Sequence, residues 1–331
     1  MQELLSISEN NYDLARFNSD WEEVRSFIKT EGLDGIELVF GNDSDGIVQP
    51  KNLVKSVHLP IWPGWTKTWR EPQSVPIDCD PFELASYYCA PTPEKLQDTF
   101  CRNLGRAADF AAAYAVVHVS HLELEEVFTQ SCRYESREIL SAVASFFNTI
   151  CSRYPNGEPP VTLAFENVRS CGLTFRSRDE VEYFTGLLTF DNWMFVLDTG
   201  HLMNGLNVTN ESEGIQKVLR TLGLLSDETL KKVRAVHFHC STSGEYQKTH
   251  LPRNPPASFS TMSFREKVNI LSPYRRNIDQ HRPFSDSASR VIIEMIQPDY
   301  LVHELVSRTK DELHQVIQQQ KALIVSLDYG Q

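Results

Sequence analysis

The chain has 331 residues, of which 41% are apolar and 23% are charged, so its composition excludes a fibre, a repeat array and a disordered segment. Asp and Glu (44) outnumber Lys and Arg (32), and the formal net charge of −12 disfavours binding to nucleic acid irrespective of its sequence, because such binding relies on cations placed against phosphates. A local basic rim would still leave duplex DNA open as a partner.

Two further properties of the sequence bear on where in the cell the protein is expected to be found. No apolar run reaches the roughly 18 residues of a membrane span, and the start, MQELLSISEN, lacks the basic and apolar parts of a secretory signal. We therefore expect a cytoplasmic protein without a membrane partner. The seven cysteines are an odd number without a Cys-x-x-Cys pair, which predicts reduced thiols and neither a disulfide framework nor a zinc ribbon.

Short apolar segments alternate with longer segments of helical periodicity along the whole chain. The predicted strands are 4–8, 35–40, 56–61, 115–120, 161–166, 193–198, 233–239 and 290–295. The predicted helices include 21–30, 92–113, 135–150, 177–188 and 300–320. Apolar strands separated by helices are typical of a parallel sheet covered by helices, and eight such units predict a closed (β/α)8 TIM barrel that forms a single domain over residues 1–331.

Two connections, after strands 3 and 7, are longer than ordinary strand-to-helix loops. The first covers residues 62–92 and is rich in tryptophan and proline, and the second covers residues 240–288. Loops of this length often form lids or binding walls, although a surface insertion is the alternative. We assign Trp62 and Trp65 to substrate binding, because tryptophan rings stack well on sugar carbons or bases. The same side chains could instead pin the loop to the barrel rim.

A polar residue ends each of six consecutive predicted strands. These residues are His58, His118, Glu166, Asp198, His237 and Glu294. In a TIM barrel, active groups lie where strands end and loops begin. Burying several carboxylates together is costly unless a cation compensates their charge, and Asp, Glu and neutral His are ligands of divalent metals. The pattern therefore predicts a divalent metal site.

Two spacings extend this candidate site. In Asp198-Thr-Gly-His201 a carboxylate and an imidazole flank one turn, and in Asp279-Gln-His281 they lie two residues apart, on the same face of an extended backbone. The nine candidate ligands exceed what one ion can use. We expect one to three ions of zinc, manganese, magnesium, cobalt or iron.

The segments GLDGIEL, FEN, LDTGH, VHFH and IIE resemble those of the xylose isomerase-like TIM-barrel superfamily, over nearly the whole chain. This superfamily includes sugar isomerases and epimerases and the endonuclease IV-type enzymes (AP endonuclease family 2). Resemblance to the epimerase branch implies one metal held by Glu166, Asp198, His237 and Glu294. Resemblance to the endonuclease IV branch adds His58, His118, His201, Asp279 and His281, which would complete the sites of three zinc ions, with Glu166 as the bridging carboxylate.

The chain also departs from the endonuclease pattern. Its Asp-x-His pair continues into Arg-Pro-Phe-Ser instead of a glycine-containing stretch, and DNA-recognition loops are not identifiable. A mouth covered by the two long connections would suit a small polar substrate better than a duplex. Whether the chain forms a homo-oligomer stays open.

Two enzymatic mechanisms are compatible with these residues. We favour an isomerase or epimerase in which a metal polarises a sugar-like carbonyl, Glu166 and Glu294 transfer the proton, and His201 and Arg282 contact the substrate. His239, two residues after His237, is a further candidate for substrate binding or an alternative metal ligand. The alternative is a multinuclear hydrolase of phosphate esters that uses all nine ligands. Oxidation at a multi-iron cluster and a non-catalytic binding barrel also stay open. The number of bound ions would discriminate between the two main mechanisms.

Overall fold

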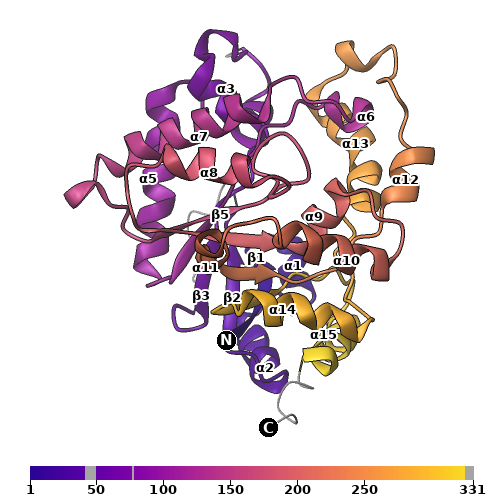
Figure 1. Cartoon of the computed structure of the whole chain (residues 1–331). Coiled ribbons are helices and arrows are strands. Elements are labelled where there is room, and N and C mark those ends of the chain that lie inside the picture. Colours follow the sequence, from indigo (N-terminus) through magenta and orange to yellow (C-terminus); the bar gives the residue numbers. More distant parts are fainter. Residues whose placement is uncertain (42–49, 77, 325–331) are drawn as a thin grey trace.

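The computed structural model describes residues 1–41, 50–76 and 78–324, which form a closed barrel of eight parallel strands paired in chain order (Figure 1). The strands are β1 Gln2–Ser8, β2 Gly35–Val39, β3 Val54–His58, β4 Tyr114–His118, β5 Thr162–Glu166, β6 Trp193–Asp198, β7 Val233–His237 and β8 Tyr300–His303. The barrel closes where β1 pairs with β8, with Leu5 opposite His303. The predicted (β/α)8 fold is confirmed.

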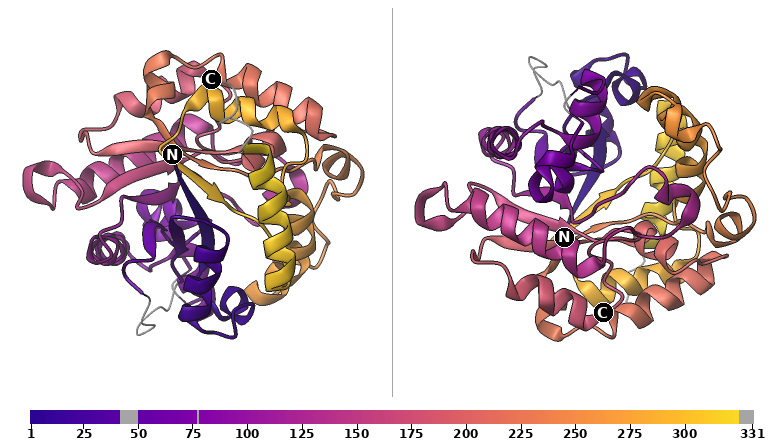
Figure 2. Two further views of the ribbon diagram at one scale, coloured as in Figure 1. Left: turned by 90° about the horizontal axis from the view of Figure 1, so that it is seen from below. Right: turned by 90° about the horizontal axis from the view of Figure 1, so that it is seen from above.

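Helices surround the strands as an outer ring (Figure 2). They are α1 Asn11–Ala15, α2 Trp21–Thr30, α3 Trp65–Arg70, α4 Pro81–Glu83, α5 Pro93–Asp109, α6 Glu126–Thr129, α7 Ser136–Cys151, α8 Arg178–Gly186, α9 Thr199–Gly205, α10 Glu211–Leu222, α11 Asp227–Lys232, α12 Gly244–Thr249, α13 Phe264–Ile278, α14 Arg290–Ile296 and α15 Lys310–Ile324. Single turns of other helix types are η1 Pro72–Ser74, η2 Leu84–Tyr88, η3 Pro155–Gly157, η4 Phe259–Thr261 and η5 Ser287–Ser289. Within the described ranges, none of these helices is long and apolar enough to cross a membrane.

Helix α5 illustrates why the sequence forms these elements. The hydroxyl of Thr92 accepts a hydrogen bond from the Lys95 amide, and Pro93 occupies the first turn, where its missing N–H costs nothing. Leu96 and Phe100 are buried at a spacing of one helical turn, on the face that packs against the barrel. Local capping and apolar periodicity therefore agree with the tertiary fold.

The prediction of the eighth strand is wrong. Residues 290–295 belong to helix α14, in which Ile292, Ile293 and Ile296 are buried on one face while Val291 and Met295 are exposed. A short apolar run does not by itself discriminate between a buried strand and one face of a helix. The true β8, Tyr300–His303, lies at the start of the segment predicted as helix 300–320, and the helix itself begins at Lys310.

The two long connections fold into helices at the end of the barrel where the strands finish. The first contains α3, η1, α4 and η2, and the second contains α12, η4, α13 and η5. Trp62 and Trp65 are only 4% and 3% exposed, and both rings pack 5.3 Å from the ring of Phe100. These tryptophans therefore fix the first connection to the outer helices α5 and α7.

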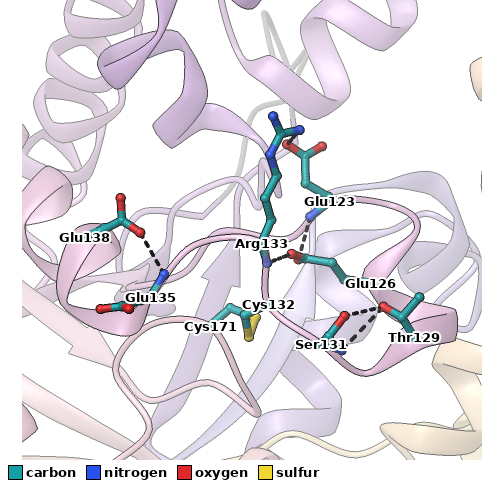
Figure 3. The surroundings of a disulfide bond; sticks show 9 residues. All are labelled: Glu123, Glu126, Thr129, Ser131, Cys132, Arg133, Glu135, Glu138 and Cys171. Atoms are coloured by element: carbon teal, nitrogen blue, oxygen red, sulfur yellow. Dashed lines mark hydrogen bonds and ion pairs between the residues drawn. A yellow bond between two sulfur atoms is a disulfide. The ribbon is translucent and has the colours of Figure 1, made fainter.

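The prediction that every cysteine is a reduced thiol is also wrong, because Cys132 and Cys171 form a disulfide (Figure 3). The two cysteines lie 39 residues apart, in the segments that follow β4 and β5. The barrel places these two segments side by side, as the bridge between Ser120 and Gly172 shows. Next to the disulfide, the Glu126 carboxylate accepts hydrogen bonds from the Glu123 and Arg133 amides. The disulfide thus links two loops at the mouth of the barrel.

Replacing Cys132 with Ser is expected to lower the free energy of unfolding by about 2 to 4 kcal/mol, because the cross-link no longer restricts the unfolded chain. Urea unfolding without reductant measures the difference. The matched control is Cys79→Ser, which changes a free, partly exposed thiol and should leave the midpoint unchanged. If reductant does not shift the wild-type midpoint toward that of Cys132→Ser, the disulfide does not stabilise the protein.

Candidate metal centre

Carboxylates and imidazoles converge where strands β3 to β7 end. Strand pairing places His118 opposite Glu166 and Asp198 opposite His237. Because parallel strands finish at the same end of the barrel, their last side chains meet there. His58 closes β3 in the same way. The tertiary structure thus brings together five of the predicted strand-end residues.

Glu166 occupies the middle of the cluster. Its Oε2 lies 3.2 Å from His58 Nε2 and 3.1 Å from His118 Nε2. Its Oε1 lies 3.1 Å from His201 Nδ1 and 3.6 Å from His237 Nδ1. Burial opposes ionisation of this carboxyl, yet the charges on His118 and His237 hold its pKa well below the usual range. One carboxylate is therefore shared by four imidazoles.

A second group of ligand atoms surrounds His237. Its Nδ1 lies 3.2 Å from Glu304 Oε2 and 3.9 Å from Asp198 Oδ2. Neither His237 Nδ1 nor Glu304 Oε2 has a hydrogen-bond partner among the described residues, although both atoms are buried. Buried polar atoms are normally paired, so two buried ligand atoms that lie 3.2 Å apart without a hydrogen bond would suit joint binding of one cation. On its other side, His237 Nε2 lies 2.9 Å from Glu37 Oε1.

A third part of the cluster contains the two predicted Asp/His pairs. His281 Nε2 lies 3.0 Å from Asp279 Oδ2, and His201 Nε2 lies 3.4 Å from the same oxygen. The ring of His239 stacks on His281 at 4.1 Å between centroids, and His239 Nε2 lies 3.0 Å from Asp198. Burial lowers the pKa of His281, but Asp279 and Glu304 outweigh it and raise that pKa to about 10. The negative charges of Asp279 and Glu304 thus favour the binding of a cation in this part of the cluster.

The ligand atoms form overlapping triplets, in each of which all atoms lie within 4.8 Å of one another. The triplets are His58/His118/Glu166, Glu166/Asp198/His237, Asp198/His239/Glu304 and His239/Asp279/His281. Successive triplets share one residue. Mixed carboxylate and imidazole groups suit zinc, manganese, iron or cobalt. The residues present therefore fit a divalent metal, and the shared ligands fit more than one ion.

Supporting side chains hold the ligands in position. The Asn167 amide donates a hydrogen bond to the Asp198 carbonyl and accepts one from the Asp198 N–H, which locks the end of β6 to β5. Glu37 on β2 accepts a hydrogen bond from the Ser56 hydroxyl and faces His237. Such outer partners orient metal-binding imidazoles. The position of Glu37 on β2 is compatible with this role, whereas the role of Asn167 depends on contacts between neighbouring strands that no local pattern predicts.

One predicted ligand lies outside the cluster. Glu294 is on α14, where its side chain is 40% exposed and faces Arg290 at 3.5 Å. Its predicted place is taken by Glu304, which directly follows β8. The error follows from the misplaced eighth strand. The motif Tyr300-Leu-Val-His-Glu304 carried the signal, because it is an apolar run that ends in a carboxylate.

The residues predicted to contact substrate are placed differently from expectation. Trp62 and Trp65 lie in the apolar core, so their rings are not free to stack on a ligand in the cavity described below. Arg282 is exposed and donates a hydrogen bond to the Thr242 hydroxyl, away from that cavity. His239 is fully buried beside Asp198, in the position of a ligand or ligand support.

A cavity of about 210 Å³ opens onto the cluster. From the cluster it is lined by His118, His201, Asp279, His281 and Glu304. Apolar side chains, including Ile61, Leu122 and Val127, form part of its wall, and Arg169 and Arg275 supply positive charge. The volume is below that of typical drug-sized pockets. It therefore suits a small polar ligand.

Comparison with known proteins supports the fold. No family model matches the chain, and no curated protein matches it in sequence. Several solved structures match nearly its whole length. An L-ribulose 3-epimerase is 13% identical with a TM-score of 0.53, covering 97% of this chain and 93% of its own. A D-tagatose 3-epimerase-like protein is 13% identical with a TM-score of 0.53, covering 98% of this chain and 99% of its own.

A D-psicose 3-epimerase from Clostridium cellulolyticum H10 is 9% identical with a TM-score of 0.52, and the match covers 99% of both chains. Identities this low show the fold alone. The predicted architecture is therefore confirmed: the chain shares its TIM-barrel fold with these sugar epimerases.

Proposed function

We propose that the protein is a divalent-metal-dependent enzyme that hydrolyses a small phosphate ester at a multinuclear centre. The observation that carries this proposal is the sharing of Glu166 and Asp198 between neighbouring ligand triplets. A single ion could not contact all of these ligands, so His58, His118, Asp279 and His281 would then bind no metal. When bound, adjacent divalent ions activate water and stabilise negative charge on a phosphoryl group.

The side chains of the protein orient the reacting groups and enclose the substrate in this reaction. Glu166 faces the imidazoles of two triplets, and Glu37 and Asn167 fix the orientation of His237 and Asp198. Orienting contacts of this kind hold reacting groups in register before the substrate arrives. The small cavity admits one compact substrate and favours a small ester over duplex DNA.

One argument for proton transfer is weaker than the sequence suggests. Covering of the mouth by both long connections favours an isomerase, but Trp62 and Trp65 of the first connection are packed in the core, whereas Arg275 and Asp279 of the second line the cavity. An isomerase or epimerase is nevertheless the second candidate, because Glu166 and Glu304 both face His237 Nδ1, at 3.6 and 3.2 Å. In that case these carboxylates would be the proton-transfer pair. The solved structures with this fold include several sugar epimerases.

Elemental analysis of protein purified without chelator tests the proposal. We expect two or three equivalents of a transition metal per chain, and metal-dependent release of phosphate from a panel of small phosphate esters. One equivalent, together with metal-dependent exchange of solvent deuterium into a ketose, would instead support the epimerase. Protein that binds no metal after incubation with zinc, manganese or iron would refute both.

A further inference from the structure

Two arginines line the cavity without a partner. The Arg169 and Arg275 side chains make no hydrogen bond or ion pair with any residue that the structure describes, although both border the cavity. Arg169 is partly buried in the loop after β5, whereas Arg275 is exposed on α13. Burial lowers the pKa of Arg169 most, the charge of Asp279 opposes this shift, and repulsion from Arg275 adds to it. An anion bound by both side chains would offset the burial of Arg169 and the repulsion between the two cations.

No carboxylate of the cavity wall supplies that anion. Asp279 is the acidic group whose charge most favours the Arg169 cation. Its Oδ2 already faces His201 at 3.4 Å and His281 at 3.0 Å, and it forms no ion pair with either arginine. Glu304 faces His237. The carboxylates at the cavity are thus directed to the candidate metal centre, and the two guanidinium groups are left for a ligand.

The loop that carries Arg169 is held in place by several contacts. The Val168 N–H donates a hydrogen bond to the Leu173 carbonyl at 2.7 Å, and Cys171 is tied to Cys132. Gly172 has a φ of +151°, and a Cβ added there would lie 1.9 Å from the Val119 carbonyl oxygen. The position therefore requires glycine. A restrained loop presents Arg169 with little loss of entropy on binding.

We propose that Arg169 and Arg275 form an anion subsite next to the metal centre, and that the substrate carries a non-reacting phosphate group that binds there. Guanidinium groups suit phosphate oxygens because their planar N–H donors form paired, charge-assisted hydrogen bonds. The substrate class is then a small sugar-like phosphate whose reacting end faces the metal ligands. The inference rests on the cavity being the active site. For an epimerase the bound phosphate is the only one the substrate needs, and for a hydrolase it is a phosphate group other than the ester that is cleaved.

Binding of two matched probes to the zinc-loaded protein tests this subsite. Isothermal titration with ribose 5-phosphate and with ribose should show that the phosphorylated sugar binds at least about tenfold more tightly. Arg169→Gln and Arg275→Gln should each weaken ribose 5-phosphate binding by at least about tenfold, since each change removes charge-assisted hydrogen bonds to the phosphate. Arg169→Lys should retain part of the affinity.

The matched control is Arg276→Gln, on the same helix as Arg275. Arg276 is exposed and donates a hydrogen bond to the Ser272 hydroxyl at 2.8 Å, so its loss should not alter binding. Equal affinity of the wild type for both probes, or unchanged affinity in the folded Arg169 and Arg275 variants, would overturn the subsite. Zinc content measured on the same samples tests the metal centre separately, since neither arginine is a metal ligand.

Discussion

Replacing Glu166 with Gln is expected to lower metal-dependent activity by more than about 100-fold and to release more than one equivalent of metal. Changes in the outer partners of metal ligands already cost about 10- to 100-fold, and Glu166 is a shared ligand at the centre of the cluster. Its carboxylate faces four imidazoles, three of them within 3.2 Å. An amide keeps the size of the side chain and removes the charge that a bridging ligand needs.

The matched control is Glu294→Gln, because Glu294 was predicted as a ligand from the sequence and lies on the exposed face of α14. This variant should keep the metal content and activity of the wild type. Elemental analysis and circular dichroism on the same samples separate loss of metal from loss of fold. Full metal content in a folded Glu166→Gln protein would contradict the assignment of Glu166.

The double replacement Asp279→Asn with His281→Ala is expected to remove about one equivalent of metal and to leave the remainder bound. These residues belong to the triplet that shares only His239 with the rest of the cluster. The triplets that contain Glu166 do not depend on them. The loss should therefore be partial, in contrast to Glu166→Gln, and the activity of a multinuclear centre should fall with it.

Titrating this variant with metal ions while monitoring fluorescence or absorbance gives the number of ions bound per chain. His314→Ala is the control, because His314 lies on α15 and pairs with Glu31 outside the centre. An unchanged stoichiometry would show that Asp279 and His281 hold no ion, and would favour the single-ion epimerase. Loss of all metal would show instead that the triplets bind their ions only together.

The sequence by itself determined the barrel and most of the candidate ligands. Strands β1 to β7 were predictable because each is a short apolar run between helical segments, and this pattern is local. Residues such as His118 and Asp198 were recognisable because they end such runs, at the point where a barrel gathers its active groups. The two Asp/His spacings were recognisable for the same reason, since their partners are close in sequence.

Only the tertiary structure decided which side chains meet across long separations. In the structure Glu304, and not Glu294, joins the cluster of ligands. The apolar run that contains Glu294 is one face of a helix, and the true last strand has only four residues, too few for a recognisable pattern. The tertiary structure also placed Trp65 in the core, paired Cys132 with Cys171, and brought Arg169 to the cavity beside Arg275. Periodicity reports the environment of a residue relative to its neighbours along the chain, whereas these contacts arise from the closure of the barrel and the packing of the loops at its mouth.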